Sequence, residues 1–121
     1  MTEIDRPDLP KTVKIIDSVY KIRCFTSPSE VDVVNRNVMW GCIDHWLNEI
    51  RLYAPTHFSA GEIWNTLWHE ILHAITDTLK INEIKNMDEI DEEHALHLLA
   101  TGLNAVLQDM NIEIYKTEKK A

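Results

Sequence analysis

The residues best suited to chemistry in this chain are His69-Glu70-Ile71-Leu72-His73, an H-E-x-x-H pattern. Residues four apart are neighbours on one helix face, with Cβ atoms about 5–6 Å apart, so two imidazoles can converge on one ion. Zinc binds such nitrogens at about 2.0–2.1 Å and leaves a position open for water in catalytic sites. Glu70 projects about 100° round the helix from His69, where its carboxylate can reach a water beside the ion. The pattern therefore predicts a zinc site with ligands His69 and His73 and with Glu70 as the general base.

Residues 59–80 are predicted to form the helix that carries this pattern. Ser59 and Glu62 occupy the two ends of a capping box, and Phe58 and Ile63 occupy the two positions of a hydrophobic staple. Apolar side chains then recur at helical period over a broad arc, which predicts a helix mostly buried in the core. That arc consists of Ile63, Trp64, Leu67, Trp68, Ile71, Leu72, Ala74, Ile75 and Leu79. The two histidines lie away from it, on a polar side that we expect to face a cleft.

Catalytic zinc usually has three protein ligands, so a third donor is expected elsewhere in the chain. The stretch after His73 contains Asp77-Thr78-Leu79-Lys80, not the Gly and His that extend the pattern in metzincins. A second helix is predicted from about Asp88 to Gln108, with an apolar stripe formed by Leu96, Leu99, Ala100, Leu103, Val106 and Leu107. Its start is rich in acids, and either Glu92 or Glu93 could point towards the first helix. The alternative is that these acids serve only the helix dipole and solubility.

The segments before the first helix indicate a small sheet. Val13 to Phe25 is rich in β-branched and aromatic residues and predicts one strand. Two further strands, Met39 to Asp44 and Glu49 to Tyr53, are predicted to form a hairpin around His45–Asn48. The expected fold class is therefore α+β, with a small antiparallel or mixed sheet packed on the two main helices.

The length of 121 residues fits a single domain spanning residues 1–121. Residues 1–12 contain two prolines and are expected as an extended lead-in, and residues 116–121 as a flexible tail. A turn or two of helix is expected after Ser27-Pro28-Ser29-Glu30, where Ser27 could act as the cap. Ile112 and Ile114 are expected in a short last strand.

Composition excludes several classes of function. The net charge of −8 and the pI near 5.1 speak against a nucleic-acid partner, because phosphate binding requires a basic surface. Three glycines are too few for a phosphate-binding glycine-rich loop. No segment approaches the roughly 20 apolar residues that cross a bilayer, and the first residues do not resemble a signal peptide. Cys24 and Cys42 lack metal-type spacing, so an intracellular protein with reduced thiols is expected.

Residues 64–75, 91–93 and 98–103 together resemble the small zincin-like proteins of phages and prophages. Strands similar to Gly41–Asp44 and Glu49–Leu52 precede the helix in that group too. The resemblance covers about residues 39–107, and its specific parts are the H-E-x-x-H pattern and the acidic pair. The chain is more distantly similar to thermolysin-type gluzincins, in which a Glu about twenty residues after the second His completes the metal site. Glu93 lies twenty residues after His73.

The resemblance implies a zinc metallopeptidase of the gluzincin type, with His69, His73 and Glu93 on zinc and Glu70 as the base. It implies a peptide or protein substrate in the cytoplasm of a bacterial host. In zincins an edge strand beside the active-site helix receives an extended substrate by strand addition. The segment from Asn48 to Tyr53 is our candidate for that edge.

Some roles stay open at this point. His97 lies one turn after Glu93 and is either a partner of a ligating imidazole, a fourth donor or a packed histidine. Larger gluzincins supply a His or Tyr to the oxyanion, and only chemistry suggests candidates here: Tyr53, His57, His94 and Tyr115. A zinc-binding phage accessory protein without turnover, or a regulatory module that binds one protein, is the competing function. The donor set also suits iron, manganese or nickel, and the sequence does not indicate an oligomeric state.

Overall fold

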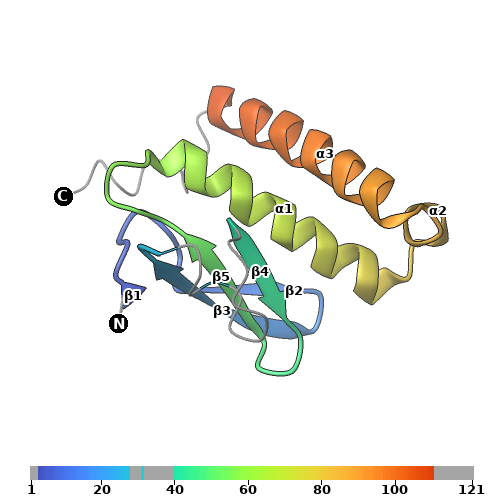
Figure 1. Ribbon diagram of the computed structural model, residues 1–121, viewed down its shortest axis with the longest axis horizontal. Helices are drawn as coiled ribbons and strands as arrows, with labels where there is room; N and C mark the ends of the chain where they lie inside the picture. The colour runs from blue at the N-terminus through green and yellow to red at the C-terminus, as the bar shows by residue number, and fades with distance from the viewer. Residues whose placement is uncertain (1–2, 28–30, 32–39, 111–121) are drawn as a thin grey trace.

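The structure is a computed structural model that describes residues 3–27, 31 and 40–110. Within these residues a small sheet lies on one side of α1, and α3 lies along its other side (Figure 1). This arrangement confirms the predicted α+β class. The elements are β1 (Glu3–Ile4), β2 (Thr12–Ile15), β3 (Ser18–Phe25), β4 (Gly41–Asp44), β5 (Glu49–Tyr53), α1 (Ala60–Leu79), α2 (Asn82–Lys85) and α3 (Glu89–Asp109).

The sheet has the strand order β1-β3-β5-β4, and β2 also pairs with β3. The strands β3 and β5 are parallel, whereas the other pairs are antiparallel. The β4–β5 hairpin was predicted, but the prediction that Asn48 to Tyr53 forms the edge is wrong. Pairing with β3 places β5 inside the sheet, where Ile50 and Leu52 are fully buried, and the hairpin then places β4 at the edge.

The single strand predicted from Val13 to Phe25 is wrong as well, because the chain turns at Ile16 and Asp17. Ile15 pairs with Ser18 across this two-residue turn. Ile16 has a φ of 57°, which is unusual for a β-branched residue and gave no turn signal in the sequence. The expected lead-in of residues 1–12 also contributes to the fold, since β1 pairs with β3 and Leu9 is in the core.

Both main helices begin where the sequence predicts. Ser59 and Glu62 form the complete capping box of α1, and the Asp88 side chain accepts from the backbone N–H of Asp91 at the start of α3. Lys80 ends α1 in the left-handed conformation, with φ 53°. The short α2 was not predicted. The expected helix beyond Pro28, the last strand at Ile112 and Ile114, and the tail 116–121 lie outside the described residues.

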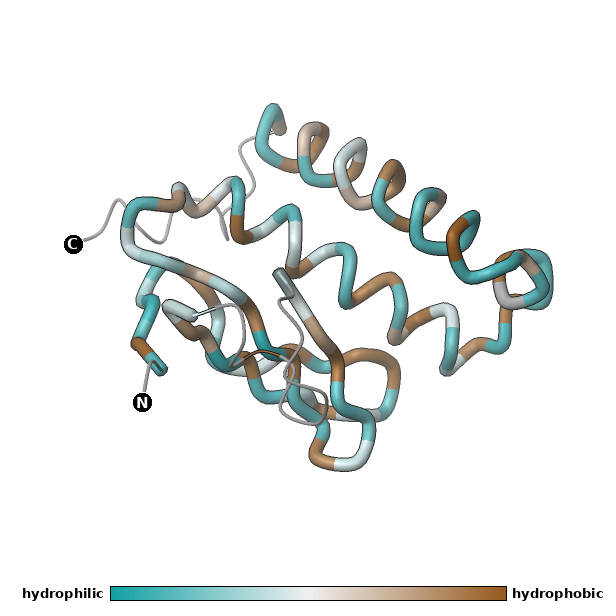
Figure 2. The backbone as a smooth tube through the Cα atoms, viewed as in Figure 1, coloured by the Kyte–Doolittle hydropathy of each residue, from teal (hydrophilic) through white to brown (hydrophobic). Residues whose placement is uncertain are grey.

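The face of α3 that contacts α1 differs from the predicted stripe. Leu96, Ala100 and Asn104 are buried, whereas Leu99 and Val106 are 53% and 56% exposed. The Asn104 amide donates to the Gly61 carbonyl at 3.0 Å, so the helices meet along small and polar side chains. Figure 2 shows that hydrophobic and hydrophilic residues alternate along both helices. The core itself lies between α1 and the sheet.

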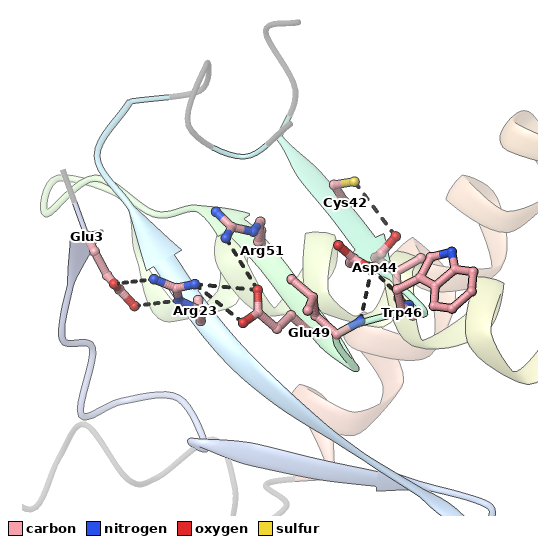
Figure 3. A network of polar contacts seen from close by, with 9 residues as sticks. Glu3, Arg23, Cys42, Asp44, Trp46, Glu49 and Arg51 are labelled. Carbon is pink, nitrogen blue, oxygen red and sulfur yellow. Dashed lines mark hydrogen bonds and ion pairs between the residues drawn. The ribbon is translucent and has the colours of Figure 1, made fainter. Parts of the chain in front are cut away.

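A ladder of charged side chains links three strands on the sheet (Figure 3). Arg23 of β3 donates to Glu3 of β1 at 2.6 and 2.8 Å and to Glu49 of β5 at 3.4 Å. Arg51 forms an ion pair with Glu49 at 3.3 Å. The ladder therefore joins β1, β3 and β5 through side chains as well as through the backbone. Among the described residues, no helix combines the length and apolar composition that crossing a membrane requires.

Candidate metal centre

His69 and His73 lie one turn apart in the middle of α1. Their Nε2 atoms are 3.1 Å apart, and their rings meet edge-on with centroids at 4.8 Å. Both side chains are largely buried, with 15% and 18% of their surface exposed. Burial lowers the pKa of His69, although the nearby Glu93 carboxylate opposes this shift. The predicted pair therefore presents two nitrogens at one point, in surroundings that favour the neutral, metal-binding form of His69.

Glu93 of α3 reaches the same point from the facing helix. Its Oε2 lies 3.0 Å from Nε2 of His69, and its Oε1 lies 2.6 Å from Nε2 of His73. Glu93 precedes the buried Leu96 by three residues and Ala100 by seven, so it lies on the face of α3 that packs on α1. Of the two acids considered from the sequence, the structure brings Glu93 rather than Glu92 into the cluster.

These three residues fit a zinc ion. Their ligand atoms lie within 4.8 Å of one another, and the closest pairs are 2.6 to 3.1 Å apart. Ligands of a tetrahedral zinc lie about 3.3 Å from each other, given bonds of about 2.0–2.1 Å. Two imidazoles and one carboxylate are also the donor set of a common class of catalytic zinc sites. Small side-chain adjustments would therefore suffice to hold the ion.

The Glu70 side chain points in a different direction from the histidines, towards the edge strand β4. A Cβ added to Gly41 of β4 would lie 3.0 Å from Oε2 of Glu70 and 2.7 Å from Cγ2 of Thr66. Glu70 is only 7% exposed, and burial, aided by the negative charge of Glu93, raises its pKa to about 8. The carboxylate thus lies in a tight space that requires a glycine on the neighbouring strand.

Glu70 lines one cleft of about 610 Å³ together with His69 and Glu93, two members of the three-residue cluster. Residues of α1, α3 and the start of β4 line it: Trp40, Gly41, Phe58, Glu62, Asn65, Thr66, His69, Glu70, Glu93 and His97. The expectation that both histidines face a cleft is confirmed for His69, whereas His73 is not among the described lining residues. His97 lies near His69, with ring centroids 6.3 Å apart, but does not belong to the three-residue cluster.

The oxyanion candidates lie elsewhere. Tyr53 packs edge-on against Phe58 at 5.3 Å, and His57 packs edge-on against the same ring at 4.9 Å. His94 is exposed on α3, and none of these three belongs to the cleft lining among the described residues. Tyr115 lies outside the described residues.

Sequence reasoning missed two features around the site. The first is the start of β4, where Trp40 and Gly41 line the cleft; the rarity of glycine in this chain was the available signal. The second is His45, expected only as a turn residue. Its Nδ1 lies 3.1 Å from the Tyr20 hydroxyl, and its Nε2 lies 3.2 Å from the Asp77 carboxylate. These contacts connect the β4–β5 turn to the last turn of α1 and so help to hold β4 beside the site.

Comparison of the chain with profiles of known protein families found no match, and comparisons with curated proteins and with solved structures found none either.

Proposed function

We propose that this chain is a zinc-dependent metallopeptidase with a zincin-like fold. In this proposal His69, His73 and Glu93 hold the metal and Glu70 is the general base. One observation carries it: three ligand atoms from two helices lie within 4.8 Å of one another, and a buried carboxylate lines a cleft beside two of these residues, His69 and Glu93. A random group of acids and histidines on a protein surface rarely has both features: donor atoms that converge on one point and a separate, buried carboxylate that can act as a base.

The chemistry of hydrolysis would be divided between the metal and Glu70. A bound zinc supplies a Lewis acid that polarises the scissile carbonyl and makes water a stronger acid. Glu70 takes the proton from the attacking water and later gives it to the leaving amine. Burial raises the pKa of Glu70 to about 8, and a nearby cation would lower it towards neutrality. A pKa near the working pH suits a group that must accept a proton and then return it.

The edge strand β4 is the proposed guide for the substrate. It ends the strand order of the sheet, and its first residue, Gly41, lines the cleft next to Glu70. An extended peptide that pairs with the outer edge of β4 would pass over this cleft, as in other strand-addition complexes. We place the substrate on β4 instead of on β5, which the sheet encloses on both sides.

The competing function is a zinc-binding accessory or regulatory protein that binds a partner without cleaving it. The positions of Tyr53, His57 and His94 away from the described cleft lining favour it, because the oxyanion then lacks those donors. The buried Glu70 carboxyl favours the enzyme, since a structural zinc site has no use for a base. By resemblance, either protein would belong to a phage or prophage and act in the cytoplasm of the bacterial host.

Metal content and turnover test the proposal together. Elemental mass spectrometry of the untagged protein should find about one zinc per chain, lost in His73→Ala. The zinc-loaded protein should cleave members of a peptide library, and a chelator should stop the cleavage. Glu70→Gln should keep the zinc and lose at least 100-fold of the activity, the range that a general base supplies. Zinc binding without any cleavage would refute the peptidase proposal and favour the accessory or regulatory protein.

A further inference from the structure

One end of the cleft has an aromatic wall that the proposed hydrolysis does not use. Trp40 stacks on Phe58 with centroids 5.2 Å apart and planes at 15°, and Tyr53 packs edge-on against both rings. These contacts fix the indole ring although Trp40 remains 57% exposed. A fixed and exposed indole beside a cleft is a platform on which a flat group can stack.

A carboxylate lies near this wall, because Glu62 bonds to Ser59, the residue that follows Phe58. Glu62 is in the first turn of α1, and its Oε1 accepts from the backbone N–H and the hydroxyl of Ser59 at 3.2 and 3.1 Å. The capping box therefore holds the carboxylate in place while the residue remains exposed to solvent. The described lining of the cleft contains no lysine or arginine, and among its three glutamates Glu62 is the one that is neither buried nor part of the His69–His73–Glu93 cluster. The cleft thus favours a positively charged group near Trp40 and Glu62.

We propose that Trp40 and Glu62 form a subsite for an arginine side chain of the peptide that occupies the cleft. The guanidinium is planar, sheds water more readily than an ammonium group and stacks on aromatic faces while pairing with a carboxylate. A purely apolar side chain would leave Glu62 without compensation, and an acidic side chain would be repelled. The cleavage of such a peptide rests on the proposed function, but its binding does not.

The distance from the metal centre limits where this arginine lies in the peptide. Glu62 precedes His69 by seven residues, which is about 10 Å along the helix axis. An extended peptide advances about 3.3 Å per residue. The arginine therefore occupies a position within about three residues of the peptide bond that the proposed site would cleave.

Binding to an inactive protein tests the subsite. We would use the zinc-loaded Glu70→Gln variant and blocked decapeptides of alternating threonine and alanine, with one arginine placed at each position in turn. At the best position, arginine is then replaced by citrulline, which has the same shape without the charge. Arginine should bind about ten-fold more tightly than citrulline, a difference of about 1.4 kcal/mol.

Three further variants locate the effect. Adding Glu62→Gln should reduce the ratio of arginine to citrulline affinity to about one, because glutamine retains the capping box but not the charge. Adding Glu83→Gln, which removes an exposed acid from α2, should leave the ratio unchanged. Trp40→Leu should weaken both peptides. Equal affinities for arginine and citrulline, or a ratio that survives Glu62→Gln, would overturn the inference.

Turnover by the unmodified protein separates this inference from the proposed function. If the peptides bind with the charge preference but are never cleaved, the peptidase proposal fails and the arginine subsite stands. If the peptides are cleaved without any preference for arginine over citrulline, the peptidase proposal stands and the subsite is refuted.

Discussion

Replacing Gly41 by alanine tests how closely β4 and α1 approach each other at the site. The new Cβ would lie 2.7 Å from Cγ2 of Thr66, 3.0 Å from Oε2 of Glu70 and 3.2 Å from Cγ of Glu70. Thr66 is β-branched and inside a helix, so its methyl group has little freedom to move away. Gly41 does not have a positive φ, so alanine brings no backbone strain, and its steric cost acts against the usual gain of about 0.4–1 kcal/mol from a less flexible unfolded chain.

The cost of Gly41→Ala should be that of overpacking by one methyl group. Such insertions typically lower the free energy of unfolding by about 1–3 kcal/mol. Gly102→Ala is the matched control, because a Cβ there meets nothing within 4 Å on the exposed side of α3. It should raise the free energy of unfolding by about 0.5–1 kcal/mol through helix propensity. Urea unfolding of the metal-free proteins measures both changes.

The clash can be assigned to its partner by a second substitution. Thr66→Ser removes Cγ2, so the double variant Gly41→Ala/Thr66→Ser should recover much of the stability lost in Gly41→Ala. Because the metal ligands are untouched, zinc binding should persist in Gly41→Ala, whereas peptide hydrolysis should fall by about 100-fold if the Glu70 carboxylate moves by about 1 Å. An alanine variant as stable as the parent, or a loss that Thr66→Ser does not relieve, would refute the close approach of β4 and α1.

Three other outcomes are expected. Glu93→Gln should weaken zinc binding by at least ten-fold in a competition titration, whereas Glu92→Gln should leave it unchanged; equal effects would contradict the assignment of the third ligand. In the metal-free protein, burial raises the pKa of Glu70 to about 8 from 4.5, so the folded state favours the protonated carboxyl. The contribution of Glu70 to the free energy of unfolding is fully present below about pH 4.5 and is lost as the pH rises to about 8. Glu70→Gln should therefore reduce the loss of stability across this pH range. An unchanged dependence of stability on pH would contradict the burial of Glu70. Zinc at 100 times its dissociation constant should stabilise the protein by about 2.7 kcal/mol, and His73→Ala should abolish this gain.

The parts of the fold that local sequence determines were predicted well. The capping box at Ser59 and the acidic start after Asp88 define both helix starts, because caps act within a few residues. The spacing of His69 and His73 also fixes their common face without any tertiary contact. The choice between Glu92 and Glu93, in contrast, is not determined by local sequence. It depends on which face of α3 packs on α1, and the small side chains at Ala100 and Asn104 determine that face.

Apart from the local turn at Ile16, the errors concern contacts between distant segments. The strand order depends on the parallel pairing of β3 with β5, which no local pattern encodes, so the edge was assigned to β5 instead of β4. The turn at Ile16 lacks the glycine or asparagine that normally marks a residue with positive φ. The roles of Trp40 and Gly41 likewise become visible only when β4 lies against α1.

The structure explains why the proposed metal donors and the proposed base come from neighbouring positions yet face different partners. The 100° step from His69 to Glu70 turns the first side chain towards α3 and the second towards β4. Helix α1 lies between those two elements (Figure 1), so it can present the two histidines to one and a desolvated carboxylate to the other. Moving α3 would therefore remove Glu93 from the cluster, and moving β4 would open the space around Glu70. The two displacements can be distinguished by measurement: moving α3 would lower the affinity for zinc, whereas moving β4 would change the pKa of Glu70.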